Sequence, residues 1–282
     1  MARFLRMDGS SLPARMTLIG GNTLWFKVSG LGPDRKHLRI ACSSPAARVS
    51  VVSARDSNVE QKLKLDIGDV RIATRATLTA HTQGGAPDHA TQGVEIQLEP
   101  ALALPPAGDE TGMLARLLLA EAKGPGQPGF VSQSRTLLSM QWMRHVLLNR
   151  LKFGPRFFGA GNAGTLAALI VAPKQVEGFE AYPTLTGFPA TNLEAIVRIA
   201  NDGTYSGYAS RREFMRNAID VAKGINPGTD PCPTGLYAWR TEKADSPGDN
   251  FVKFVTESGT DFYTLTDAFI RDPLLRGKGK GK

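Results

Sequence analysis

The sequence contains few of the residues that build metal sites, disulfide frameworks or membrane spans. Its 282 residues include only two cysteines and four histidines, and no apolar run approaches the roughly 20 residues that cross a bilayer. Cys42 and Cys232 stand far apart, and neither belongs to a Cys/His pattern with metal-ligand spacing. The sequence therefore favours two separate buried thiols over a disulfide, and it predicts a protein without metal, cofactor or membrane insertion.

Motifs for nucleophilic and nucleotide chemistry are also missing. There is no Gly-x-Ser-x-Gly elbow, and no glycine-rich phosphate loop precedes a helix. Cys42 lies within a predicted strand and no histidine follows Cys232, which argues against a Cys–His protease. Carboxylates are then the remaining candidates for chemistry.

The positive charge of the chain is dispersed. The net charge is +8 with a pI near 9.6. Half of this excess lies on each side of residue 105, and the compact basic run is the tail 276–282. Nucleic-acid-binding proteins usually concentrate their charge on one face, so the even distribution predicts no nucleic-acid partner. Such a charge suits a polyanion such as the bacterial cell wall or serves solubility alone, and both interpretations stay open.

The pattern of apolar residues divides the chain into two predicted domains, 1–105 and 106–282. The first contains about seven short segments rich in Val, Ile, Thr and Leu, which predicts an antiparallel β-sandwich of the immunoglobulin-like (Ig-like) kind. In the segment 23–29, alternation assigns Leu24, Phe26 and Val28 to the core. Trp25 takes the other face, where it is either half-covered by a loop, which we favour, or part of a contact surface. The Pro-rich segment 99–110 is typical of a linker.

After residue 106 the periodicity becomes helical. Helices are predicted over 111–122, 136–153, 165–171, 191–200 and 210–224, the last two with the capping boxes Thr191–Glu194 and Ser210–Glu213. The helix over 136–153 is apolar around much of its circumference, which predicts burial on several sides. The segments after residue 235 alternate enough for a small hairpin or ribbon, so the second domain is predicted to be mainly α-helical.

Glu121 stands at the end of a predicted apolar helix, just before a loop with three glycines and two prolines, 124–129. Burial at that point would hold the carboxyl in place and raise its pKa, as general-acid cleavage of a glycosidic bond requires. If a hydroxyl of the sugar attacks, one carboxylate serves as acid and base in turn, whereas hydrolysis needs a second. The alternative is a solvated glutamate, which the helix dipole slightly disfavours at a C-terminus.

Four segments, in order, resemble the cell-wall hydrolase family of spore-cortex-lytic (SleB-type) enzymes. They are LLLAEAKG (117–124), QWMRHVLLNRL (141–151), TLAALIVAPKQVEGF (165–179) and FMRNAIDVAKGINPGTDPCPTGLYAW (214–239), and the match spans roughly residues 111–240. The family pattern is a helix ending in Glu-Ala-Arg-Gly, a helix ending in Asn-Arg, a Pro-x-Gln-Phe segment, and Gly-x-x-Pro before Leu-Tyr-Phe. This sequence departs from it in having Lys123 for the arginine, a longer loop after Glu121, and three residues between Gln175 and Phe179.

The resemblance implies a lysozyme-like helical fold that cuts the glycan strands of peptidoglycan, with Glu121 as the general acid/base. Asn149 and Arg150 match the Asn-Arg pair, which implies that they support the site. The residues implied for substrate binding are Gln175, Tyr237, Asn149 and Phe179. Two alternatives stay open: Asn149 as a helix C-cap and Tyr237 as a core residue. The candidates for a second carboxylate are Glu177 and Glu180.

Together these expectations predict a two-domain peptidoglycan-cleaving glycosidase, a muramidase or a lytic transglycosylase. Segment 1–21 has no apolar run of signal-peptide length, which predicts synthesis in the cytoplasm and action in the periplasm or cell wall of a target bacterium. An antibacterial toxin delivered as a type VI secretion effector, or a phage lysin, fits this expectation, with a secretion-machine component and an immunity protein as candidate partners. The alternative is a non-catalytic adaptor or structural protein of such a particle with an inactive lysozyme-like domain.

Overall fold

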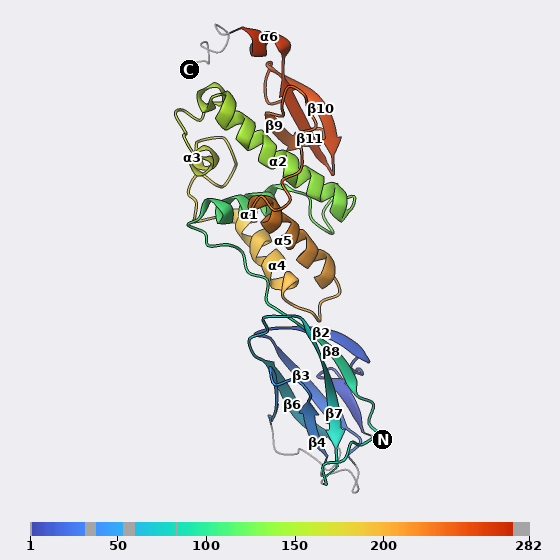
Figure 1. Ribbon diagram of the computed structural model, residues 1–282. Helices are drawn as coiled ribbons and strands as arrows, with labels where there is room; N and C mark the ends of the chain where they lie inside the picture. The colour runs from blue at the N-terminus through green and yellow to red at the C-terminus, as the bar shows by residue number, and fades with distance from the viewer. Residues whose placement is uncertain (1, 32–37, 53–59, 83, 273–282) are drawn as a thin grey trace. The chain divides into compact units, whose positions relative to one another are not determined.

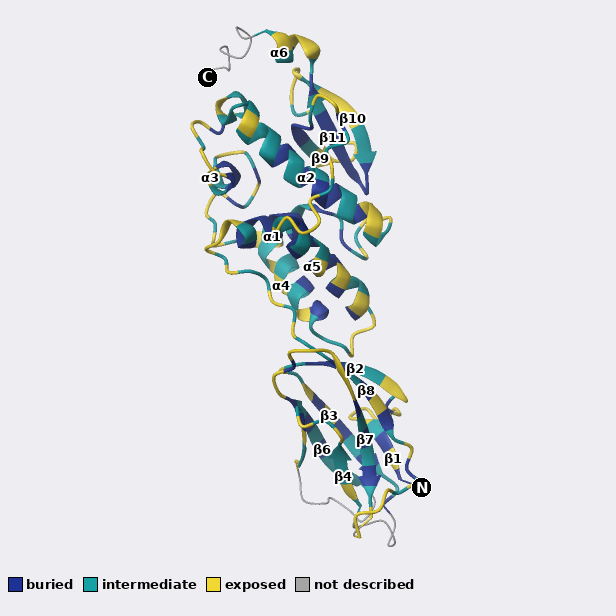
Figure 2. Cartoon of the chain, viewed as in Figure 1, coloured by how far each residue is buried: buried dark blue, intermediate teal, exposed yellow. Residues whose placement is uncertain are grey.

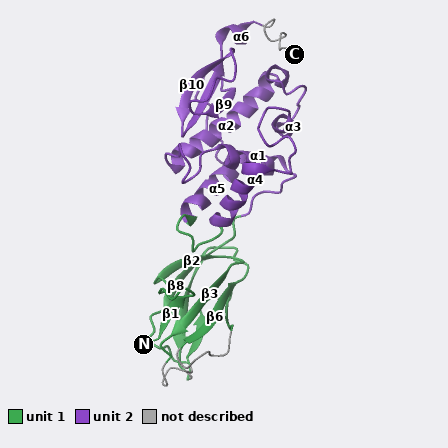
Figure 3. Ribbon diagram, turned by 180° about the vertical axis from the view of Figure 1, so that it is seen from behind, with its two compact units in different colours: residues 1–102, 201–208 green, residues 103–200, 209–282 purple. Residues whose placement is uncertain are grey.

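The computed structural model describes residues 2–31, 38–52, 60–82 and 84–272 (Figure 1). The basic tail 276–282 lies outside these residues. Strands occupy the N-terminal half and helices with a small sheet occupy the C-terminal half, so the chain is a mixed α+β protein. It divides into an N-terminal unit, residues 1–102 with 201–208, and a C-terminal unit, residues 103–200 with 209–282 (Figure 3).

Two four-stranded sheets build the N-terminal unit. One has the order β1-β3-β6-β5 and the other the order β2-β8-β7-β4. The strands are β1 (Arg3–Arg6), β2 (Arg15–Ile19), β3 (Thr23–Ser29), β4 (Arg39–Cys42), β5 (Ala47–Val51), β6 (Glu60–Ile67), β7 (Thr74–His81) and β8 (Val94–Glu99). Antiparallel pairing prevails, as predicted, in both sheets.

Two details of these sheets correct the prediction. Strands β2 and β8 pair in parallel, with Leu18 opposite Leu98. Parallel neighbours need a long connection between them, which no local turn signal reveals. Strand β1 was not predicted, because four residues are too few to display alternation, yet it pairs with β3 through Phe4 and Val28.

A single apolar core joins the inner faces of both sheets. Leu24, Phe26 and Val28 are buried, as alternation along β3 predicted, and they share a cluster with residues of the other sheet such as Leu78 and Ile96. Figure 2 shows this alternation of buried and exposed positions along the strands. Trp25, on the opposite face of β3, is 48% exposed, so about half of its side chain is covered, as favoured, and the loop as its cover stays a prediction.

Segment 201–208 belongs to the N-terminal unit, whereas the sequence analysis placed it in the second domain. The Asn201 side chain accepts from the backbone N–H of Leu102 at 2.8 Å and donates to its carbonyl at 3.0 Å. The Asn22 side chain donates to the Asn201 carbonyl at 2.7 Å. These bonds satisfy backbone groups at the start of the predicted linker, which fixes that part of the chain.

The C-terminal unit contains the predicted helices. They are α1 (Glu110–Glu121), α2 (Gln133–Phe153), α3 (Leu166–Val171), α4 (Gly187–Ala200) and α5 (Tyr208–Ala222). Helix α2 contacts α1, α3 and the C-terminal strands, which confirms its burial on several sides. Both predicted capping boxes are wrong, because Thr191 and Ser210 lie inside helices that have already begun. The N-caps of α2 and α3 are Ser132 and Thr165.

A three-stranded antiparallel sheet of order β10-β11-β9 follows the helices. Its strands are β9 (Ala238–Thr241), β10 (Phe251–Glu257) and β11 (Thr260–Leu265), and the short helices η2 (Pro155–Phe158) and α6 (Asp267–Arg271) lie outside it. An aromatic cluster of Phe153, Phe158, Tyr237 and Phe269 packs at the end of α2. No helix in the described residues is long and apolar enough to span a membrane.

Both cysteines are free thiols. Cys232 is buried, and Cys42 is only partly buried on the edge strand β4. Cys42 belongs to the N-terminal unit and Cys232 to the C-terminal unit. The prediction of two separate thiols is therefore confirmed, but the predicted burial holds for Cys232 alone.

Candidate active site

Glu121 is the last residue of α1, and packing fixes the helix that carries it. Ala115, Leu117, Leu118 and Leu119 are fully buried, because the apolar residues of this helix surround its axis. The next residue, Ala122, is already extended with ψ 143°. The chain therefore leaves the helix directly at Glu121, and the carboxylate stands where the packed helix meets a loop.

The loop 124–129 after Glu121 is held against the turn between β10 and β11. The backbone N–H of Gly124 donates to the Gln127 side chain at 2.8 Å, which closes the loop on itself. Gly129 and Gly259 then meet backbone to backbone, both with positive φ, and a Cβ on Gly129 would lie 3.0 Å from the Gly259 Cα. Glycine at both positions is what permits this close approach.

Trp239 supplies the one hydrogen bond recorded for the Glu121 side chain in the described residues. Its indole Nε1 donates to Glu121 Oε2 at 2.9 Å, across 118 positions of sequence. This bond fixes the carboxyl group and leaves Oε1 without a protein partner in the same part of the chain. A carboxyl oriented through one oxygen can present the other to a ligand.

Burial raises the pKa of the Glu121 carboxyl above its ordinary value. The Trp239 hydrogen bond and the charge of Lys123 act in the opposite direction, because both stabilise the ionised form, and the negative charge of Glu177 adds to the rise. Desolvation is the largest of these causes. The carboxyl is thus held protonated to higher pH than a solvated glutamate, which is the property that a general acid needs.

Glu121 lines a groove of about 630 Å³ in the C-terminal unit. The groove walls come from η2, the segment 174–180 before α4, and strand β9. The lining residues are Glu121, Arg150, Phe157, Phe158, Lys174, Gln175, Val176, Glu177, Glu180, Ala238, Trp239, Arg240, Thr241, Pro247 and Phe251. A second groove, of about 400 Å³, shares Glu121 and Thr241 with the first and extends along the loop 127–129 to Phe188. Glu121 therefore lies where two open grooves meet.

Gln175, predicted to bind substrate, lies in the groove with its amide engaged by protein groups. Its Oε1 accepts from Arg150 Nη1 at 2.9 Å, and its Nε2 donates to the Phe158 carbonyl at 2.7 Å. Arg150 in turn donates from Nε to the Tyr237 carbonyl at 2.6 Å. Gln175 thus holds the groove wall together as well as lining it.

Asn149 lies outside the groove and supports the loop that precedes β9. Its Nδ2 donates to Asp230 at 2.6 Å and to the Leu236 carbonyl at 2.9 Å. It is not a helix C-cap, since α2 continues to Phe153 and is capped by Gly154. Its position agrees with a supporting role and provides no contact with a ligand in the groove.

Phe179 and Tyr237 are core residues in this structure. Phe179 is 0% exposed and stacks on Tyr182 with ring centroids 5.7 Å apart. Tyr237 is 8% exposed and stacks on Phe158 at the same centroid distance. Both lie outside the groove lining, so the alternative of a core role holds for Tyr237, and Phe179 does not reach the groove.

Both candidates for a second carboxylate line the groove. Glu177 is the one whose charge acts on the pKa of Glu121. Glu180 accepts from the backbone N–H of Gly178 at 3.0 Å, which ties it to its own turn. Of the two, Glu177 is the better placed to act together with Glu121.

Trp239 and Arg240 are the site residues that the sequence reasoning missed. Both lie on β9 and line the groove. Trp239 stood at the end of the quoted segment 214–239, but nothing in its spacing connected it with Glu121. An aromatic residue with a polar tip in an amphipathic edge strand was the only available signal.

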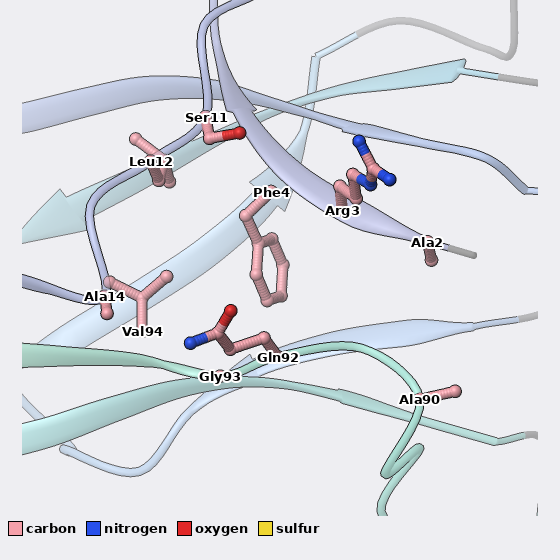
Figure 4. A pocket seen from close by; sticks show the side chains of 10 residues that line it. All are labelled: Ala2, Arg3, Phe4, Ser11, Leu12, Ala14, Ala90, Gln92, Gly93 and Val94. Atoms are coloured by element: carbon pink, nitrogen blue, oxygen red, sulfur yellow. The ribbon is translucent and has the colours of Figure 1, made fainter.

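A separate cavity of about 240 Å³ lies within the N-terminal unit (Figure 4). Its lining is Ala2, Arg3, Phe4, Ser11, Leu12, Ala14, Ala90, Gln92, Gly93 and Val94. These lining residues include no carboxylate or histidine. In the described residues, no group of three or more His, Cys, Asp or Glu side chains is placed to hold a metal ion.

No protein-family model matches the chain, and no curated protein matches it at a significant level. Among solved structures, it is similar to the BIgI domain of beta protein from S. agalactiae, solved bound to CEACAM1. That match has 11% sequence identity and a TM-score of 0.22, and it covers 36% of this chain and 96% of that chain. A likeness this weak bears on neither function nor site.

Proposed function

We propose that the C-terminal unit is a lysozyme-like glycosidase that cleaves the glycan strands of peptidoglycan, with Glu121 as the general acid/base. The observation that carries the proposal is a carboxyl group with a raised pKa, oriented by Trp239, at the junction of two open grooves. A polymer can lie across such a junction with its scissile bond at the acid. The SleB-like segments around Glu121 support the same function.

The N-terminal unit, in this proposal, is an Ig-like β-sandwich that serves either in binding or in delivery of the enzyme. Its two sheets with a shared apolar core support that architecture. The protein would then act where its substrate lies, in the periplasm or cell wall of a target bacterium.

The chemistry of bond cleavage follows from the groove. Glu121 Oε1, which has no protein partner among the described residues, would protonate the leaving glycosidic oxygen. If Glu177 activates water or attacks the sugar, the products carry reducing ends. If a hydroxyl of the sugar attacks, Glu121 recovers its proton from that hydroxyl, and the products carry anhydro ends.

The test is digestion of purified peptidoglycan by the full chain, followed by mass spectrometry of the released muropeptides. Glycan cleavage is expected, with anhydro or reducing ends that distinguish the two routes, and the Glu121→Gln variant should release none above background. Failure of the wild-type chain to release glycan fragments from walls of several compositions would overturn the enzyme proposal. That outcome would favour the non-catalytic adaptor.

A further inference from the structure

Arg150 is a cation in the groove wall that no carboxylate neutralises within the described residues. Its Nε and Nη1 donate to Tyr237 and Gln175, and its guanidinium carbon lies 5.3 Å from the centroid of the Phe158 ring. These contacts fix the plane of the guanidinium but occupy only part of its fork of five N–H donors. In the part of the chain that the structure describes, Nη2 has no protein acceptor.

Arg240 places a second positive charge beside the first. It is exposed on β9, lines the same groove, and has no carboxylate partner among the described residues. Burial, together with the charge of Arg240, lowers the pKa of Arg150 to about 10. Two like charges that line one groove repel each other, and an anion bound between them would remove that repulsion.

Different charges act on the two buried groups of the groove, Glu121 and Arg150. Glu177 influences Glu121, whereas the group that acts on Arg150 is Arg240. Lys174 and Glu180 also line the groove, and Glu180 is tied to the Gly178 backbone. Arg150 and Arg240 thus line one groove, and no carboxylate of the described residues acts on Arg150.

We propose that Arg150 and Arg240 form an anion subsite that binds a carboxylate carried by the sugar's substituent. The inference rests on the proposed function, because it assumes that a glycan lies in the groove with its glycosidic oxygen at Glu121. A planar guanidinium with free N–H groups binds a carboxylate through paired, charge-assisted hydrogen bonds. Stem peptides of peptidoglycan carry free carboxylates, and a neutral chitin-like strand carries none, so the subsite would select a peptide-bearing strand.

The test is a binding measurement on the full chain with Glu121→Gln, so that ligand is not consumed. Isothermal titration would compare a soluble glycan fragment with free stem-peptide carboxylates, the same fragment with its carboxylates amidated, and a neutral oligomer of N-acetylglucosamine. The free carboxylates should strengthen binding, and adding Arg240→Gln should weaken it about tenfold for that fragment alone. The matched control is Arg216→Gln, which removes an exposed arginine of α5 that lies outside the groove and should leave all three affinities unchanged.

The outcomes separate this subsite from the proposed function. Equal affinities for the carboxylated and amidated fragments would overturn the subsite while leaving a glycan-binding groove in place. A loss on Arg240→Gln that is the same for all three ligands would overturn it as well, because the arginine would then contact the sugar backbone. No binding of any fragment would overturn the proposed function, and the subsite with it.

Discussion

The two units differ in how deeply they bury polar and charged side chains. Among the described residues of the N-terminal unit, Thr91 is the one buried polar side chain, and the ion pair of Arg15 with Glu95 lies at the surface, with side chains 83% and 64% exposed. The C-terminal unit buries Glu257 and Asp261 to 2% exposure and pairs them with Arg135 and Lys253. The groove with Glu121 and Arg150 belongs to this second unit.

This difference shows which kind of side chain the packing of each unit fixes, apolar in the first unit and charged as well in the second. An apolar core between two sheets needs only alternation, and it gives stability without fixing any charge. A buried charge costs free energy unless it is paired, and removing one partner is costly as well. A unit that holds several such groups has its polar geometry determined by packing, which agrees with the proposal that its groove performs chemistry.

The largest expected effect concerns the independence of the two cores. Phe26→Ala removes a fully buried ring of the N-terminal unit and should cost about 3–5 kcal/mol of unfolding free energy, with Phe214→Ala as its matched counterpart in the C-terminal unit. Hydrogen exchange read by mass spectrometry should show lost protection only in the unit that carries the change. If Phe26→Ala exposes both units equally, they unfold as one and the comparison fails.

The second effect is on cleavage. Glu121→Gln keeps the size of the side chain but removes its proton, so peptidoglycan cleavage should fall by about 100-fold or more. The control is Glu95→Gln, which removes an exposed carboxylate of the N-terminal unit and should leave the rate unchanged. Near-wild-type cleavage by the Glu121 variant would remove the acid from the mechanism.

The same variant should alter how stability depends on pH. Because the folded-state pKa of Glu121 is raised, its contribution to stability is fully present below the unfolded-state pKa and is lost as pH rises through the folded one. Glu121→Gln should therefore be at least as stable as the wild type at neutral pH, and its unfolding free energy should decline less with rising pH. Urea unfolding across a pH series would reveal this, and a clearly less stable variant at pH 7 would contradict it.

A smaller effect is expected for the indole that orients the acid. Trp239→Phe keeps an aromatic ring but removes the N–H donor to Glu121 Oε2, so kcat/KM should fall roughly tenfold. That bond lowers the pKa of Glu121, so its loss should move the alkaline limb of the pH–rate profile to higher pH. An unmoved limb would mean that the indole does not act on the acid.

On the anhydro route, in which Glu177 takes no chemical part, the smallest effect is expected from this neighbouring carboxylate. Glu177→Gln removes the negative charge that raises the pKa of Glu121, so the alkaline limb should move to lower pH, opposite to the Trp239 variant. Glu180→Gln is the matched control from the same groove and should leave the limb in place. If both glutamate variants shift the limb alike, the pKa of Glu121 responds to the total charge of the groove and not to the position of Glu177.

Much of the architecture was readable from the sequence. Alternation in 23–29 identified the buried residues of β3. Helical periodicity predicted five helices in the C-terminal unit, and the structure contains all five, as α1 to α5. The capping boxes failed because Thr191 and Ser210 have the right residue types inside helices that begin earlier. Glu121 was singled out because a carboxylate ends the apolar run 117–120 before a loop and because the SleB-like segments include it.

What the sequence by itself determined is therefore local: which face of a strand is apolar, which segments coil into helices, and that one acid ends a buried helix. Tertiary structure alone decided that β2 pairs in parallel with β8, that Phe179 turns into the core, and that Trp239 donates to Glu121. The physical reason is that side-chain periodicity specifies the face a residue takes and not its neighbour. Neighbours across 118 positions are selected by the packing of whole elements.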